Sequence, residues 1–142
     1  MLLTIPLTFR FRLQAGAHLD LSPSMHWPAP VLADDLRQPV GPVLVTVEYR
    51  IATADRDAFL AALDDLASER RRDGAYAWSV FEDAAKPGRV LETFLTESWL
   101  EHMRHHERVT EADVVQQRRV QAFLAAPAVV THFVTAERGS DR

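Results

Sequence analysis

The sequence predicts an α+β domain in which four antiparallel strands carry helices on one face. Three observations lead to this fold class: four short segments rich in β-forming residues, two longer segments with helical spacing of apolar residues, and the order in which they alternate. That order is strand, helix, strand, strand, helix, strand, with the second helix in two pieces. The 142 residues suffice for one domain that buries its own core.

The first strand and the first helix are predicted between residues 42 and 74. Residues 42–51 (PVLVTVEYRI) alternate in a pattern typical of a strand. Thr53 is a suitable N-cap for the helix that follows, in which apolar residues recur at helical spacing over 59–67. Arg70 to Arg72 fall in its last turn, where we expect a solvated helix end, and Gly74 supplies the stop.

A hairpin is predicted next. Residues 76–82 (YAWSVFE) and 89–96 (RVLETFLT) read as two strands joined by a turn at Pro87-Gly88. We expect the all-apolar row of the first strand to meet the helices. The opposite face, on which we place Glu92 and Phe94, is half polar and half aromatic, and this predicts a lined cavity or a dimer interface.

The second helix and the last strand complete the domain. Ser98 opens a short helix through the histidine-rich 102–106, and Thr110 caps a longer helix that stops before Pro127. Residues 128–135 (AVVTHFVT) form the last strand. The resulting βαββαβ order is that of ferredoxin-like domains.

Residues 1–40 are expected to form an extended, proline-rich arm outside the domain. Residues 1–9 (MLLTIPLTF) are apolar, but they are too few to span a bilayer and lack the flanking pattern of a signal peptide. Prolines at 23, 28, 30, 39 and 42 interrupt any helix or central strand. We therefore predict a domain at 41–136 and a polar tail at 137–142.

The composition excludes several kinds of site and partner. The chain has no cysteine, so neither a disulfide nor a cysteine-ligated metal is available. Its 16 basic and 20 acidic side chains give a net charge of −4, which argues against a nucleic-acid partner. The lack of cysteine fits a reducing compartment. We expect a cytoplasmic protein that meets the membrane only through residues 1–12, if at all.

The domain, over about residues 41–136, resembles a known family. Residues 78–110 (WSVFEDAAKPGRVLETFLTESWLEHMRHHERVT) are similar to the antibiotic-biosynthesis-monooxygenase-like branch of dimeric α+β barrels. The shared features are the aromatic second strand, the D-x-x-x-P-G hairpin, Glu92 on the third strand and the W-x-x-H helix. This resemblance implies a homodimer and, in its enzymes, a cofactor-free oxygenase that acts on a polyphenol or quinol.

A further resemblance involves both halves of the chain. The segments FRFRL, LDLSPSMHWPAPVLA, PVLVTVEYRI and ESWLEHMRHHERVT are similar to the cytosolic C-terminal tail of major facilitator superfamily exporters of the transmembrane secretion effector type, which includes drug and siderophore exporters. This implies that residues 1–9 are the stub of the last membrane helix, with Arg10 and Arg12 in the cytosol. We find no other membrane segment and expect that the chain is not itself a transporter.

Three histidines raise the question of a metal site. His102, His105 and His106 are three and four residues apart, so His102 shares a helical face with either partner. Neutral imidazoles at that spacing can bind a divalent metal. No nearby carboxylate is clearly placed as a third ligand, however, and His132 would have to arrive from the last strand. We therefore expect no metal and no cofactor.

Aromatic and charged side chains of the sheet are the other candidates. Trp78 and Phe94 could line a cavity for a flat apolar ligand, or they could pack in the core and the dimer interface. A carboxylate such as Glu92 on an inner sheet face must be paired, hydrated or functional. We expect an ion pair between Glu92 and Arg50 of the neighbouring strand, and the alternative is a general base in the cavity.

The sequence thus favours a non-catalytic, ligand-sensing homodimer that pairs through its open sheet face and binds an apolar or aromatic small molecule. Its candidate ligand-binding residues are Arg50, Trp78, Glu92, Phe94, His102 and His106. The alternative is a cofactor-independent monooxygenase acting on a quinol or polyphenol, with Glu92 and His102 as catalytic candidates. Well-known enzymes of the resembling family use an asparagine, and this chain has none. The enzyme therefore ranks second.

Overall fold

The computed structural model describes residues 32–33, 41–106 and 111–136, without the side chains of 105, 106, 111 and 112. The elements follow the order β1 (Val43–Arg50), α1 (Arg56–Arg72), β2 (Tyr76–Glu82), β3 (Arg89–Thr96), α2 (Trp99–His106), α3 (Glu111–Gln121) and β4 (Val129–Val134). The predicted order, including the second helix in two pieces, is confirmed. The predicted tail, and all of the arm except residues 32–33, lie outside the described residues.

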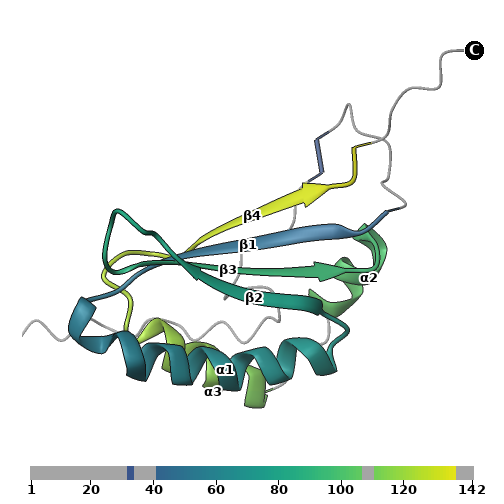
Figure 1. Cartoon of the computed structure of the whole chain (residues 1–142). Helices are drawn as coiled ribbons and strands as arrows, with labels where there is room; N and C mark the ends of the chain where they lie inside the picture. Colours follow the sequence, from purple (N-terminus) through teal and green to yellow (C-terminus); the bar gives the residue numbers. More distant parts are fainter. Residues whose placement is uncertain (1–31, 34–40, 107–110, 137–142) are drawn as a thin grey trace, which may run out of the picture.

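The four strands form one antiparallel sheet with the order β2-β3-β1-β4, and the predicted ferredoxin-like fold is confirmed (Figure 1). β1 lies inside the sheet, where Val47 is opposite Glu92 of β3 on one side and Val130 of β4 on the other. Figure 1 shows α1 and α3 across one face of the sheet and α2 near the end of β3. No helix in the described ranges is both long and apolar enough to cross a membrane.

The core lies between the sheet and the helices. Alternate residues of β1 from Val43 to Tyr49 are buried while their neighbours are not, because one face of the strand packs on the helices. Tyr49 meets Phe59 of α1 edge to face, with ring centroids 5.3 Å apart. The prediction that the apolar row of the first strand meets the helices is therefore confirmed.

The helix ends follow the sequence signals only in part. Thr53 begins a turn of 3-10 helix (η1, Thr53–Asp55), so the N-cap of α1 is Asp55, two residues later than predicted, and it makes no side-chain cap hydrogen bond. Gly74 ends α1 as predicted, with a φ of 100°. Ser98 caps α2 as predicted, because its Oγ accepts a hydrogen bond from the Glu101 amide at 3.2 Å. Thr110 lies outside the described residues.

The face of the sheet turned away from α1 and α3 carries three transverse rows of side chains, and beyond them a charged pair of positions, Arg50 and Arg89. The pairing places Tyr76, Leu95, Leu44 and Phe133 in one row, Ser79, Thr93, Thr46 and Thr131 in the next, and Phe81, Leu91, Glu48 and Val129 in the third. The outer apolar members, Tyr76, Phe81, Val129 and Phe133, are exposed. Two largely apolar rows thus flank a row of hydroxyl groups. We call this surface the open sheet face.

Two residues that we placed on the open sheet face are not there. Glu92 lies opposite Val47, and Phe94 lies opposite Val45, so both point toward the helices. Both side chains are buried. The prediction of their face is wrong, because β3 mixes apolar and polar residues in both of its rows and the alternation alone does not distinguish them.

Candidate functional site

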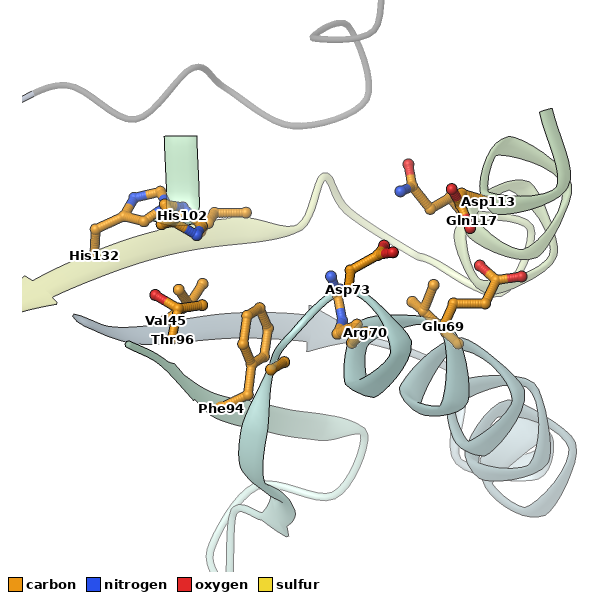
Figure 2. A pocket seen from close by; sticks show the side chains of 13 residues that line it. Val45, Glu69, Arg70, Asp73, Phe94, Thr96, His102, Asp113, Gln117 and His132 are labelled. Atoms are coloured by element: carbon orange, nitrogen blue, oxygen red, sulfur yellow. The ribbon is translucent and has the colours of Figure 1, made fainter. Parts of the chain in front are cut away.

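A cavity of about 90 Å³ lies between the helix-facing side of the sheet and the helices (Figure 2). All three helices and strands β1, β3 and β4 contribute to its wall. The wall has an aromatic end and an acidic end. Different elements build the two ends.

Side chains from three elements meet at the aromatic end. Phe94 and Thr96 come from β3, His102 from α2 and His132 from β4 (Figure 2). The ring centroids of His102 and His132 are 4.8 Å apart, and the Trp99 ring lies about 6 Å from both. The cap at Ser98 fixes the start of α2 and hence the position of its first turn, from which His102 points inward.

The acidic end is built from two helices. Glu69 and Asp73 are one turn apart near the C-terminus of α1, and Asp113 and Gln117 are one turn apart on α3. Arg72 Nη2 contacts Asp113 Oδ1 at 3.0 Å. Burial raises the pKa of Glu69 to about 7, and a hydrogen bond to Asp113 and the charge of Asp113 act in the same direction. About half of the Glu69 carboxyl groups therefore carry a proton near neutral pH.

Three polar atoms in the cavity wall have no hydrogen-bond partner in the part of the chain that the structure describes. They are Thr96 Oγ1, Gln117 Oε1 and Glu69 Oε2. The side chain of Thr96 is 2% exposed and that of Gln117 is 6% exposed, so bulk water does not replace the missing partners. Buried polar atoms normally have a partner. Such atoms are the positions in a cavity wall at which a water molecule or a polar ligand can bind.

Behind the cavity, Glu92 lies in a saturated hydrogen-bond network. Its Oε1 accepts from Arg70 Nε at 2.5 Å and from Trp78 Nε1 at 2.9 Å. Its Oε2 accepts from Tyr49 Oη at 2.7 Å and from Arg70 Nη2 at 3.1 Å. Burial, and then the charge of Glu92, raise the pKa of Tyr49 well above its usual value, so the phenol keeps the proton that it donates.

The predicted pairing of Glu92 with Arg50 is wrong. The side chain of Arg50 extends from the opposite face of β1 and pairs with Glu48, with Nη2 and Oε1 3.1 Å apart. Glu48 also pairs with Arg89, at 2.8 Å, and hydrogen bonding to Arg89 lowers the pKa of Glu48. The actual partner of Glu92 is Arg70, whose side chain is 13% exposed, so the prediction of a solvated helix end is wrong for this residue.

The structure brings some of the predicted site residues together and separates others. Phe94 and His102 line the cavity. Glu92 and Trp78 do not line it. Trp78 donates to Glu92, and Glu92 accepts from the wall residue Arg70, which stacks over the Phe94 ring at 4.8 Å. Arg50 is exposed on the other face of the sheet. The side chain of His106 lies outside the described residues.

The acidic end of the cavity was not predicted from the sequence. The available signal was the spacing of four in two pairs, Glu69 with Asp73 and Asp113 with Gln117, since that spacing places both members on one helical face. Nothing in the sequence shows that the two faces oppose each other. Within the described ranges, no three side chains of the metal-binding types converge on one point.

A family model supplies the identification. The model described as "transmembrane secretion effector" matches residues 1–140. The chain belongs to the transmembrane secretion effector family. This confirms the resemblance that we drew from the segments on both sides of the proline-rich connector. No curated protein matches this member of the family.

Solved structures with a similar fold confirm, for this transmembrane secretion effector domain, the resemblance to the antibiotic-biosynthesis-monooxygenase-like fold. A protein from Caulobacter crescentus CB15, described as an antibiotic biosynthesis monooxygenase, has a TM-score of 0.61 and 16% identity over 70% of this chain and 94% of its own. One from Nitrosomonas europaea, described in the same way, has a TM-score of 0.59 and 17% identity over 70% of this chain and 94% of its own. A Mycobacterium tuberculosis protein has a TM-score of 0.57 and 22% identity over 70% of this chain and all of its own length. At such identities the likeness shows the fold alone.

Proposed function

We propose that this domain is a non-catalytic ligand sensor that works as a homodimer in the cytoplasm, beside the membrane part of a secretion system. The observation that carries the proposal is the set of buried polar atoms turned into the cavity. Thr96 Oγ1 and Gln117 Oε1 make no hydrogen bond within the described residues, and both side chains are more than nine-tenths buried. A cavity with convergent polar groups in an apolar wall is the usual form of a small-molecule site.

The hydrogen bonds of Glu92 and its place outside the cavity wall favour ligand binding over catalysis as the function of the domain. Each of its two oxygens accepts two hydrogen bonds, so the lone pairs that a general base needs are occupied. The carboxylate also does not line the cavity. This residue therefore supports the position of Arg70 and contacts no ligand, which removes one of the two catalytic candidates.

The open sheet face supports the homodimer. Apolar side chains at its outer positions, Tyr76, Phe81, Val129 and Phe133, are 41 to 58% exposed. Water-exposed apolar rows on a sheet are stabilised when a second surface covers them. A second copy of the same sheet offers the same two apolar rows around its hydroxyl row, so the surface is complementary to itself across a two-fold axis.

Family membership supports the proposed link to secretion. Membership in the transmembrane secretion effector family associates the chain with export across a membrane. A ligand-binding homodimer on the cytoplasmic side could report the presence of a cargo molecule to such an exporter. On this proposal, occupation of the cavity between α1 and α3 is the signal that the domain passes on.

Two measurements test the proposal on the full chain. Sedimentation velocity should give the mass of a dimer. Thermal unfolding in the presence of small aromatic amines, phenols and acids should show a raised Tm for at least one of these classes. Gln117→Leu should abolish that rise, while Gln116→Leu, one position along α3 and outside the cavity wall, should keep it. A monomer whose Tm no compound raises would contradict the proposal.

One observation favours a second function, a cofactor-independent monooxygenase. His102 and His132 meet beside Trp99 in a fold shared with proteins described as antibiotic biosynthesis monooxygenases. Oxygen uptake with anthrones and quinols tests this alternative. Uptake that falls strongly in His102→Ala would establish the enzyme, and an absence of uptake across the panel would eliminate it.

A further inference from the structure

The polar side chains of the cavity wall fall into two groups. Thr96 Oγ1, Gln117 Oε1 and Glu69 Oε2 have no hydrogen-bond partner in the part of the chain that the structure describes. The other polar side chains of the wall each take part in an interaction, and they are Arg70, Asp73, His102, Asp113 and His132. Thr96, Gln117 and Glu69 are therefore the residues that set the chemistry of a guest.

The three unpartnered atoms lie at two ends of the cavity. Thr96 comes from β3 at the aromatic end, and Gln117 of α3 lies with Glu69 of α1 at the acidic end (Figure 2). Because Thr96 and Gln117 are both more than nine-tenths buried, a molecule that pairs with either must enter the cavity. A guest that satisfies both ends must carry a polar group at each of its own ends.

The acidic end determines the hydrogen-bonding type of one of these groups. Gln117 Oε1 is a carbonyl oxygen and Glu69 Oε2 belongs to a carboxylate when that group is ionised, so both atoms are acceptors. The Thr96 hydroxyl can donate or accept. The guest therefore needs an O–H or N–H donor at the acidic end, and a hydroxyl or a similar polar group serves at the aromatic end.

The apolar part of the wall distinguishes an organic guest from water. Val45, Leu66, Phe94 and Val130 line the cavity alongside the polar residues. Water can pair with the polar atoms at either end, but against these apolar side chains it lacks the roughly two to four polar partners that a buried water needs. A carbon chain between two polar groups meets both parts of the wall. The cavity volume of about 90 Å³ is below the roughly 150 Å³ of an apolar cavity that holds benzene, so the chain must be short.

We infer that the cavity binds a short linear molecule with a hydrogen-bonding group at each end, a donor beside Gln117 and Glu69 and a hydroxyl or similar group beside Thr96. Short diols and hydroxy amides belong to this class. The inference rests on the proposed function, because it names the class of ligand for the same cavity. It differs from the flat aromatic ligand that the sequence suggested.

The test compares uncharged probes of similar size on the full chain. A diol series (1,3-propanediol, 1,4-butanediol and 1,5-pentanediol) has a donor at both ends, 1-pentanol has a donor at one end, and 1,2-dimethoxyethane has acceptors only. We choose pH 8, above the Glu69 pKa of about 7, so that this carboxyl group is mostly an acceptor. In an NMR titration, the best diol should shift the side-chain amide of Gln117 and the methyl group of Thr96 with one shared Kd.

The Kd of the best diol should be at least fivefold below that of 1-pentanol and of 1,2-dimethoxyethane. A fivefold ratio corresponds to about 1 kcal/mol, which is the net contribution of one hydrogen bond. This comparison uses the wild type alone, so it does not depend on whether a variant folds.

Variants then assign the two ends. Thr96→Val removes the hydroxyl and keeps the shape of the side chain, so it should weaken diol binding at least fivefold and leave the Kd of 1-pentanol unchanged. Gln117→Leu should weaken the binding of both probes, because both donate at the acidic end. Thr53→Val, at an exposed position outside the wall, is the matched control and should leave every Kd unchanged.

The outcomes separate this inference from the proposed function. If 1-pentanol or 1,2-dimethoxyethane binds as tightly as the best diol, or if Thr96→Val leaves the Kd of the diol unchanged, the two-ended inference is wrong while the cavity remains a ligand site. If neither these probes nor the wider panel shifts the signals of Gln117 and Thr96 or raises the Tm, the polar atoms bind water only. The inference and the proposed function then both fail.

Discussion

Arg70 and Glu92 form a bidentate ion pair in the interior, between the last turn of α1 and strand β3. Two guanidinium nitrogens meet the two carboxylate oxygens at 2.5 and 3.1 Å, and the Glu92 side chain has no exposed surface. The remaining acceptor positions of the carboxylate are taken by Tyr49 and Trp78. A buried charge is tolerated when it is paired and fully hydrogen-bonded in this way. The pair thereby fixes the end of α1 against the sheet and places Arg70 in the cavity wall.

Removing one member of the pair should strongly destabilise the domain. Glu92→Gln leaves the buried guanidinium of Arg70 without its counter-charge, and we expect a loss of about 3–5 kcal/mol in the free energy of unfolding. Urea unfolding followed by circular dichroism measures this loss. Glu82→Gln is the matched control, because Glu82 pairs with Arg56 at 2.7 Å with both side chains exposed. Equal midpoints for the two variants would show that the buried pair has no special role.

The acidic end predicts a specific dependence of stability on pH. The pKa of Glu69 is about 7 in the folded chain, above its ordinary 4.5, so the folded state holds the proton more tightly than the unfolded state. The contribution of Glu69 is therefore complete below about pH 4.5 and is lost as the pH rises through 7. Over this range the loss is at most about 3 kcal/mol.

Glu69→Gln isolates this contribution, because the amide resembles the protonated acid at every pH. The variant and the wild type should unfold at similar urea concentrations at pH 5, and the variant should be the more stable of the two at pH 8. Other titrating groups affect both proteins alike. If the two unfolding curves keep the same separation at both pH values, the burial of Glu69 has no energetic consequence.

The open sheet face predicts where a single charge should dissociate the proposed dimer. Phe133 is 52% exposed and ends the apolar row of Tyr76, Leu95 and Leu44. Phe133→Arg should raise the dimer dissociation constant by on the order of 100-fold, because it buries an unpaired charge. Sedimentation equilibrium measures the constant, and circular dichroism confirms folding. Val115→Arg, at a 54% exposed position of α3, should remain dimeric. If Phe133→Arg stays dimeric and Val115→Arg dissociates, the dimer interface lies on the helices and not on the open sheet face.

Much of the fold could be predicted because the periodic signals were strong. Strands β2 and β3 have the bounds that the sequence predicts, since aromatic and β-branched runs flank the Pro87-Gly88 turn. Gly74 and Ser98 mark helix ends through local backbone chemistry that depends on few distant contacts. The βαββαβ order then leaves few ways to build one sheet.

The site was harder to predict because its partners come from distant parts of the chain. Glu92 is 22 residues from Arg70, and the prediction chose Arg50 on the adjacent strand as its partner. Trp78 points to Glu92 because of an irregularity in β2, where Ala77 has a φ of 50° and the pairing register shifts between Tyr76 and Ser79. A shift of one residue reverses the face of a side chain.

The hairpin turn provides a last prediction about the fold that holds the site. Gly88 has a φ of 83°, and a Cβ on it would lie 2.3 Å from the Ile51 carbonyl oxygen, while the Ile51 amide donates to the Gly88 oxygen at 2.8 Å. Gly88→Ala must strain the backbone or break that contact, and it should cost more than about 1 kcal/mol in urea unfolding. Lys86→Ala, in the same turn and exposed, should unfold at the same urea concentration as the wild type.

Because β3 begins at residue 89 and carries Glu92, Phe94 and Thr96, we expect Gly88→Ala also to loosen the cavity wall. The NMR signals of Thr96 should therefore broaden or shift in Gly88→Ala, and unchanged signals would show that the turn and the cavity are independent.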